Sequence, residues 1–455
     1  MQIHFIAIGG SAMHNLAIAL HHKGYIITGS DDEIFEPSRS RLQQLGLLPE
    51  SMGWYPDKIT PEIDAVILGM HARADNPELA RAKELGIKVY SYPEFIYEQT
   101  KNKKRVVIGG SHGKTTITSM ILHVCKQVRM EVDFMVGAQL EGFDCMVKLS
   151  ESAPVVILEG DEYLSSPDDR RPKFHLYLPH IAVLSGIAWD HINVFPTFDI
   201  YVDQFRQFIA LIQSHGKLFY SKDDTSLADL AGESFANQPV IEAYSTHPHR
   251  IEEGVTILTD SGKSYPIQVF GQHNLQNLSA AKAVCLELGI DAEQFYKAIA
   301  SFAGASKRLE LVARGERSVF YKDFAHSPSK LRATTSALKQ QYPNRKLVAC
   351  MELHTFSSLN KAFLQHYSGT MELADQAWIY YSPKTLAHKK LPDIQPEEVA
   401  QAFGTQNVQV FTDREALMDQ ILGTTWDETN LLMMTSGTFD GIDFKKLGAT
   451  IYAKP

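Results

Sequence analysis

Residues 109–116 read GGSHGKTT and follow directly on RVVI, a short apolar run that predicts a buried strand. The stretch TTITSMILHVCKQV comes next and predicts a helix that begins inside this turn. Glycines let backbone N–H groups point at an anion, and the start of the helix presents its positive end to the same anion. The turn therefore predicts a site for the phosphates of a nucleoside triphosphate on an α/β fold.

The motif is a short form of the phosphate loop. Ile108 stands where the full pattern has another glycine, so the motif is the G-x-x-G-K-T of Gly110, Gly113, Lys114 and Thr115. Lys114 supplies a mobile positive charge for the β- and γ-phosphates, and the Thr115 hydroxyl can bind Mg2+. The alternative is a strand-to-helix turn with a chance Lys-Thr pair, which the register of strand, loop and helix disfavours.

The composition indicates a globular protein of two to four domains. The chain has 455 residues, of which 44% are hydrophobic and 21% charged. Its net charge of −9 argues against a nucleic-acid partner, because proteins that bind the phosphate backbone carry a basic surplus. The four cysteines are scattered, which is typical of a reducing compartment. Without a secretory leader or a long apolar run, we expect a cytoplasmic protein with no membrane insertion.

The first segment has the pattern of a βαβ unit. Residues 2–8 predict a strand, HNLAIALHHKG a helix and YIITGSD a second strand. The glycine pattern between them is imperfect, because Ala7 and Ala12 flank Gly9 where glycines are usual, and a plain tight turn is an equal alternative. Asp31 ends the second strand, where an acid commonly reaches a ribose hydroxyl. The lysine-rich stretch 101–104 predicts a solvated linker.

Polar residues follow two further strands of the second segment. Glu159 ends the strand in PVVILEGDEY, and Asp190 and His191 follow the strand in IAVLSGIAWDHINVF. Because ligands gather at the carboxyl ends of strands, we expect these groups near the phosphate loop as Mg2+ ligands. The alternative for His191 is a surface or capping role. Asn274 and Asn277 share one face of a predicted helix, where nucleotide contact and helix bracing are equal alternatives.

The third segment begins near Arg308. The stretches VFYKDF, KLVACMEL, AWIYYS, VQVF and NLLMMTSG predict strands that alternate with helices, which is typical of another parallel α/β sheet. The chain resembles the Mur ligase family in a series of motifs that occur in the same order. They are the short phosphate loop, Glu159, the Asp-His pair, GQHNLQNLSAA, KRLE and DFAHSP. Members of that family are ATP-dependent enzymes that build the peptide of bacterial peptidoglycan.

The resemblance implies three α/β domains. It places a Rossmann-like UDP-sugar domain at 1–100, a central ATPase domain with a mainly parallel sheet at 105–306, and a Rossmann-like C-terminal domain at 307–455. The implied cofactors are ATP and Mg2+, and the implied partners are UDP-N-acetylmuramate and a peptide or amino acid. We expect a monomer or a homodimer.

The family motifs also imply site residues in this chain. The catalytic residues would be Lys114, His191 and Arg308. ATP would be bound by Gly110, Ser111, His112, Gly113, Lys114, Thr115, Thr116, Asn274, Asn277, Arg308, Asp323 and His326. Mg2+ would be held by Thr115, Glu159, Glu162 and His191. The UDP-sugar would be bound by Gly9, Gly10, Ser11, Met13, Ser30 and Asp31.

The implied chemistry activates a carboxylate as an acyl phosphate, which an amine then attacks. Within the family, GSDDEIFEPSRSRL, the insert GDEYLSSPDDRRPKFHLYLP and MTSGTFDGI favour the members that join L-Ala-γ-D-Glu-meso-diaminopimelate to UDP-N-acetylmuramate in peptidoglycan recycling. The alternatives are ligation of L-alanine in de novo synthesis, a non-catalytic nucleotide sensor on the same scaffold, and a folate polyglutamylating ligase. Arg206 stands 15 residues after His191, so the carbamylated lysine of some relatives is not expected.

Overall fold

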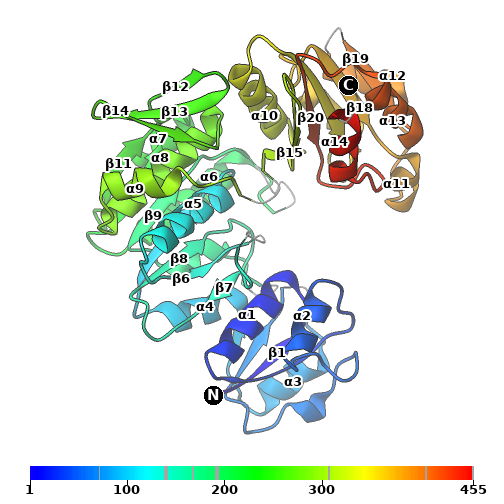
Figure 1. Cartoon of the computed structure of the whole chain (residues 1–455). Helices are drawn as coiled ribbons and strands as arrows, with labels where there is room; N and C mark the ends of the chain where they lie inside the picture. The colour runs from blue at the N-terminus through cyan, green and yellow to red at the C-terminus, as the bar shows by residue number, and fades with distance from the viewer. Residues whose placement is uncertain are drawn as a thin grey trace. The chain divides into compact units, whose positions relative to one another are not determined.

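The computed structural model describes residues 1–70, 72–137, 142–166, 169–189, 194–305, 308–404 and 407–452 (Figure 1). The chain forms two compact units. One consists of Met1–His247 and Gln276–Ile299, and the other of Pro248–Leu275 and Ala300–Pro455. Among the residues described, no helix combines the length and the apolar character needed to cross a membrane.

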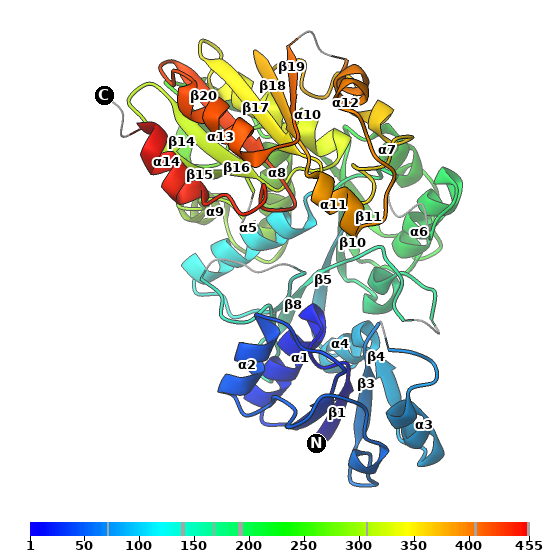
Figure 2. The same ribbon diagram turned by 90° about the vertical axis from the view of Figure 1, so that its right-hand side faces the viewer.

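The first unit begins with a parallel four-stranded sheet in the order β2-β1-β3-β4 (Figure 2). Its strands are β1 (Gln2–Ile6), β2 (Ile26–Ser30), β3 (Ala65–Leu68) and β4 (Val89–Ser91). Its helices are α1 (Ser11–His22), α2 (Ser38–Gln44), α3 (Pro77–Glu84) and α4 (Tyr92–Thr100), and η1 (Pro56–Lys58) is a short 3-10 turn. The βαβ opening predicted from the apolar pattern is confirmed.

A seven-stranded sheet follows in the same unit, in the order β11-β10-β9-β5-β8-β6-β7. Its strands are β5 (Lys104–Gly109), β6 (Asp133–Met135), β7 (Val147–Lys148), β8 (Val155–Glu159), β9 (Ile181–Leu184), β10 (Lys217–Ser221) and β11 (Val240–Tyr244). Only β7 pairs antiparallel. The helical segments are α5 (Lys114–Gln127), η2 (Lys173–Tyr177), α6 (Phe198–Ala210), α7 (Thr225–Ala231) and α9 (Ala292–Ile299). The neighbours β5, β8 and β9 therefore end at one edge of the sheet.

The prediction of a solvated linker at 101–104 holds for Lys101 and Asn102, which are exposed, but not for Lys103 and Lys104. Lys104 is the first residue of β5, and the Lys103 ammonium donates to Oδ2 of the fully buried Asp133 over 2.7 Å. Lys103 also donates to the carbonyl oxygens of Ser150 and Ala153. A run of lysines is usually solvated, but here a buried carboxylate and two carbonyls offer one of them a complete set of acceptors.

The second unit contains two sheets. The antiparallel hairpins of β12 (His249–Glu252), β13 (Val255–Asp260) and β14 (Lys263–Ile267) form the smaller sheet. The larger sheet has the order β15-β16-β20-β17-β18-β19 and is parallel except where β15 joins β16. Its strands are β15 (Glu310–Arg314), β16 (Val319–Asp323), β17 (Lys346–Glu352), β18 (Gln376–Tyr380), β19 (Val408–Phe411) and β20 (Thr429–Met434). The predicted parallel sheet is thus confirmed apart from its β15 edge.

The chain passes between the two units at three points, one of which falls inside the long helix α8 (Gln272–Glu287). The remaining helical segments lie in the same part of the chain as the C-terminal sheet. They are α10 (Pro328–Gln341), η3 (Leu364–Tyr367), α11 (Pro383–His388), α12 (Pro396–Phe403), α13 (Arg414–Gly423) and α14 (Phe444–Tyr452). Sequence patterns did not indicate β12–β15, because these strands are largely exposed and carry no buried apolar run.

Candidate active site

The phosphate loop joins β5 to α5 and depends on its two glycines. Gly110 and Gly113 have φ values of 117° and 81°, in the left-handed region that favours glycine. A Cβ atom at Gly113 would lie 2.3 Å from Oδ1 of Asn277, and one at Gly110 would lie 2.4 Å from Oγ of Ser185. The backbone nitrogen of Ser185, 2.7 Å from a Cβ at Gly110, therefore leaves no room for a side chain there, whereas a side chain at Gly113 would displace that of Asn277.

Lys114 is the first residue of α5 and folds back over the loop. Its ammonium donates to the carbonyl oxygen of Gly110 and to Oε2 of Glu162, both over 2.7 Å. Burial alone would lower the pKa of Lys114, but the carboxylates of Glu162, Asp161 and Glu159 outweigh that effect and raise the pKa. Lys114 is therefore a cation that already lies within the loop.

The Thr115 hydroxyl and the Glu159 carboxylate are in direct contact. The hydroxyl donates to Oε1 of Glu159 over 2.8 Å, and the backbone N–H of Gly137 donates to Oε2 over 3.0 Å. Burial raises the pKa of Glu159, although Gly137 and Lys114 both favour its charged form. Hydroxyl and carboxylate oxygens are hard donors of the kind that Mg2+ prefers, so this pair fits the expected metal.

The other expected metal ligands are placed differently. His191, with Asp190, lies outside the described residues. Glu162 is the counterion of Lys114, and its Oε1 lies 3.5 Å from the Tyr201 hydroxyl. Within the described ranges, which exclude 190–193, no group of three or more His, Cys, Asp or Glu side chains could hold a metal ion. The metal-binding roles of Glu162 and His191 stay predictions.

The rest of the phosphate loop is tied to the segment after β9 and to α6. The Ser111 hydroxyl accepts the backbone N–H of Ala188 over 2.7 Å and lies 3.2 Å from the Tyr201 hydroxyl. The carbonyl oxygen of His112 accepts a hydrogen bond from the Ser185 hydroxyl, and the side chain of Thr116 is buried in α5. These contacts hold the loop in place.

The turn between β1 and α1 in the first domain contacts the carboxylate of Asp31. The backbone N–H of Gly9 donates to Oδ2 of Asp31 over 2.7 Å, and burial raises the pKa of Asp31 to about 6. The carbonyl oxygen of Ser30 accepts the N–H of Ala7 over 2.9 Å, and Ala7 has a φ of 69°, unusual for a residue with a side chain. Asp31 thus accepts a hydrogen bond within the turn, and its contact with a ribose stays a prediction.

A cavity of about 620 Å3 brings this turn and the phosphate loop together within the first unit. Predicted residues on its wall are Gly10, Ser11, Met13, Lys114, Thr115 and Glu159. The sequence predicted no role for several other lining residues, among them Asn15, Arg41, Asp161, Tyr163 and Lys173. The residues Asp161 and Tyr163 lie within the GDEY stretch that continues from Glu159, which is the one sequence signal for them.

Four predicted ATP ligands lie in the second unit. Asp323 ends β16 and accepts the backbone N–H groups of Leu309 and Ala325 over 2.6 and 2.7 Å. The Arg308 guanidinium lies over the ring of Phe324, 5.1 Å from its centroid. Nδ1 of His326 lies 2.8 Å from the Phe324 carbonyl oxygen. Asn274 donates to the Phe270 carbonyl oxygen over 2.9 Å, whereas Asn277 lies against the phosphate loop of the first unit.

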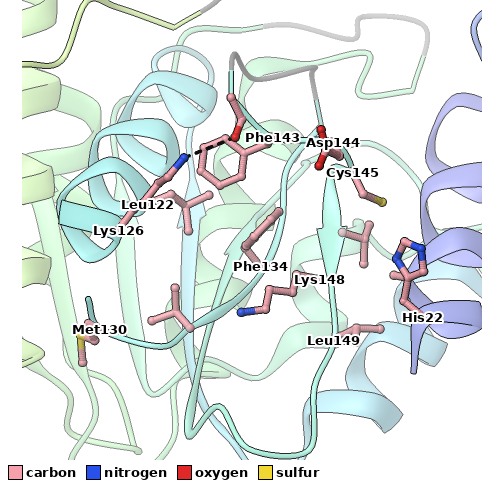
Figure 3. A pocket seen from close by; sticks show the side chains of 14 residues that line it. His22, Leu122, Lys126, Met130, Phe134, Phe143, Asp144, Cys145, Lys148 and Leu149 are labelled. Carbon is pink, nitrogen blue, oxygen red and sulfur yellow. Dashed lines mark hydrogen bonds between the residues drawn. The ribbon is translucent and has the colours of Figure 1, made fainter. Parts of the chain in front are cut away.

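A second cavity, of about 500 Å3, lies between α1, α5 and the β6–β7 hairpin (Figure 3). Its wall is largely apolar, with Phe134 and Phe143 in edge-to-face contact at 5.3 Å. Lys126 extends over the Phe143 ring and donates to the Gly142 carbonyl oxygen over 3.5 Å. None of the predicted site residues lines this cavity, although Val147 lines both this cavity and the one at the candidate active site.

Three family models match consecutive parts of the chain. They are the Mur ligase family catalytic domain at residues 2–104, the Mur ligase middle domain at 108–285, and the Mur ligase glutamate ligase domain at 307–437.

The chain also resembles individual ligases. A UDP-N-acetylmuramate–L-alanine ligase from Caldicellulosiruptor saccharolyticus is 32% identical over 82% of this chain and 81% of its own length. A UDP-N-acetylmuramate–L-alanyl-gamma-D-glutamyl-meso-2,6-diaminoheptandioate ligase from Haemophilus influenzae is 27% identical over 98% of both chains. The crystal structure of a UDP-N-acetylmuramate-alanine ligase from Thermotoga maritima shares the fold over 100% of this chain and 99% of its own, with a TM-score of 0.68 at 20% identity.

These matches confirm the expected α/β fold of three domains, each built on a mainly parallel sheet. They extend over nearly the whole chain, and the phosphate loop and the acidic end of β8 fall within the part that matches the middle domain. The chain belongs to the Mur ligase family of ATP-dependent enzymes that form amide bonds.

Proposed function

We propose that this enzyme joins the carboxylate of UDP-N-acetylmuramate to the amine of L-Ala-γ-D-Glu-meso-diaminopimelate in peptidoglycan recycling. The observation that carries the proposal is the single cavity of about 620 Å3 whose wall includes both the Gly10–Ser11 turn and the Lys114–Thr115 loop. A UDP-sugar held at the turn can extend toward the loop, where its carboxylate meets the γ-phosphoryl group of ATP.

In this reaction a carboxylate oxygen attacks the γ-phosphorus, the bond to the ADP oxygen breaks, and an acyl phosphate forms. The amine then displaces phosphate. Lys114 stabilises the charge that develops on the transferring phosphoryl oxygens. Thr115 and Glu159 would hold Mg2+, with His191 and Glu162 as further proposed ligands, and the ion would neutralise phosphate charge when bound. Asn274, Asn277, Arg308, Asp323 and His326 stay proposed ATP contacts.

L-alanine is the second candidate amine. The 32% identity to the Caldicellulosiruptor L-alanine ligase favours it, while the Haemophilus ligase, whose name includes the tripeptide, matches over 98% of both chains. One reaction that contains ATP, UDP-N-acetylmuramate, L-alanine and the tripeptide tests the choice. We expect mass spectrometry to detect the UDP-muramoyl tripeptide as the main product. A UDP-muramoyl alanine product would establish the second candidate, and no turnover with either amine would refute the proposed reaction.

The domain bounds and the location are also proposals. We retain the domains at 1–100, 105–306 and 307–455, with the lysine-rich stretch 101–104 as their first junction. A cytoplasmic location is supported by the four cysteines, which are all free thiols and of which Cys125, Cys285 and Cys350 are buried.

A further inference from the structure

The segment between Glu159 and η2 folds back on itself and presents Lys173 to the cavity. Leu164 forms an isolated bridge with Pro172, and Ser165 donates its backbone N–H to the Arg171 carbonyl oxygen over 2.9 Å. The backbone N–H of Lys173 donates to the Tyr163 carbonyl oxygen over 2.9 Å. These contacts close the segment and fix the backbone of Lys173 beside the strand that ends in Glu159.

The residue after Lys173 anchors this position in the core. Phe174 is fully buried and stacks on Phe208 with ring centroids 4.4 Å apart. Its backbone N–H donates to the Asp161 carbonyl oxygen over 3.1 Å. Because the chain is held on both sides, Lys173 has little freedom to leave the cavity wall.

Lys173 and Lys114 are the two lysines on this wall, and each is paired with an acid. Lys114 contacts Glu162, whose side chain is 2% exposed, whereas Lys173 contacts Asp161 over 2.6 Å, with the two side chains 24% and 40% exposed. The Lys173–Asp161 pair is the more exposed of the two, so an incoming anion can replace Asp161 at lower cost than it can replace Glu162. Of the two lysines, Lys173 therefore carries the more available positive charge. Arg41, the other cation on this wall, is engaged by Oδ1 of Asn15 and the carbonyl oxygen of Asp144.

We propose that Lys173 binds the carboxylate of the UDP-sugar that is to be phosphorylated, and so positions it against the γ-phosphoryl group. The proposal rests on the proposed function. In the proposed function two anions of the substrates already have partners, since Lys114 would bind the phosphates of ATP and the Gly10–Ser11 turn would bind the UDP diphosphate. Lys173 lines the same cavity as Thr115 and Glu159, where the proposed reaction brings the acceptor carboxylate to the γ-phosphoryl group. A lysine at this point also disfavours premature entry of a protonated amine.

The test compares the binding of two UDP-sugars, only one of which carries the carboxylate that Lys173 is proposed to bind. UDP-N-acetylmuramate carries the lactyl carboxylate and UDP-N-acetylglucosamine lacks it. We expect Lys173→Met to weaken binding of UDP-N-acetylmuramate by about ten- to a hundredfold, as for loss of a hydrogen bond to a charged group. Binding of UDP-N-acetylglucosamine should change by less than about threefold. Isothermal titration calorimetry without ATP measures both affinities.

Two variants separate charge recognition from structural damage. Lys173→Arg keeps the charge and should retain most of the preference for the carboxylated ligand. Arg171→Met removes a cation from the same segment, where Arg171 pairs with Asp169 and is 60% exposed, and should leave both affinities unchanged. If Lys173→Met folds poorly, Lys173→Gln takes its place.

The outcomes distinguish this inference from the proposed function. An equal loss of affinity for both ligands, or no loss for either, would overturn the role of Lys173. Failure of the unaltered enzyme to bind UDP-N-acetylmuramate would instead refute the proposed function.

Discussion

The ammonium of Lys114 lies 2.7 Å from Oε2 of Glu162, so the cation expected to meet the nucleotide phosphates is already paired with a buried acid. Because Glu162 is the more buried partner, it holds Lys114 close to the loop and keeps it charged. A phosphate that enters the loop therefore meets a positioned cation, which reduces the reorganisation that phosphoryl transfer requires.

Replacement of Lys114 by alanine should slow turnover by roughly two to four powers of ten, about 3–5 kcal/mol of transition-state stabilisation. The affinity for UDP-N-acetylmuramate should barely change, because the first-domain turn holds that nucleotide. Steady-state phosphate release and calorimetry measure the two quantities.

Lys126→Ala is the matched control for this change. Lys126 is on the same helix, but its ammonium points to the Gly142 carbonyl oxygen at the second cavity. Its removal should leave turnover nearly intact. Unchanged turnover in Lys114→Ala would show that 109–116 is not the ATP loop.

The pKa of Asp31, about 6 in the folded chain, predicts a pH-dependent stability. A raised carboxyl pKa means that the folded state favours the protonated form of Asp31. Protonated Asp31 therefore contributes its full stabilisation below about pH 4, and this contribution is lost as the pH rises through about 6. Asparagine does not ionise, so only the parent protein loses this contribution. The unfolding free energy of Asp31→Asn minus that of the parent should therefore increase by about 1–3 kcal/mol from pH 4.5 to pH 7.5. Urea unfolding at both pH values measures the difference, and a constant difference would contradict the prediction.

Ala7 has a φ of 69°, where a side chain costs free energy and glycine does not. Ala7→Gly should therefore raise the unfolding free energy by roughly 0.5–1 kcal/mol, after allowance for the greater entropy of the unfolded chain. Ala12→Gly is the control, because Ala12 is an exposed residue of α1 and its replacement should lower stability by up to about 1 kcal/mol. Thermal unfolding of both variants checks the opposite signs.

Asn15 connects the first domain to the segment before β7. Its Oδ1 accepts the backbone N–H of Met146 over 3.0 Å and Nη1 of Arg41 over 3.1 Å. Asn15→Leu leaves these donors without that acceptor and should cost about 2–4 kcal/mol of unfolding free energy. Asn15→Asp keeps an acceptor oxygen and should cost less. Equal effects of the two variants in urea unfolding would refute this account.

The amino-acid sequence by itself determined the local parts of this enzyme. The strand–loop–helix around Gly110 and Gly113 forms as expected, since glycine is the residue that adopts the required φ without strain and the helix begins at Lys114. The parallel sheets also follow from apolar runs that alternate with helical patterns.

Only the tertiary structure decided which residues meet. Lys114 and Glu162 are 48 positions apart, and Lys173 reaches the cavity through a segment that reads as a polar insert. Lys103, in a run of lysines, likewise pairs with a buried acid that is distant in the sequence, Asp133. Apolar periodicity specifies local conformation, whereas contacts between distant residues depend on strand order and on the path of the connecting segments, which no local pattern encodes.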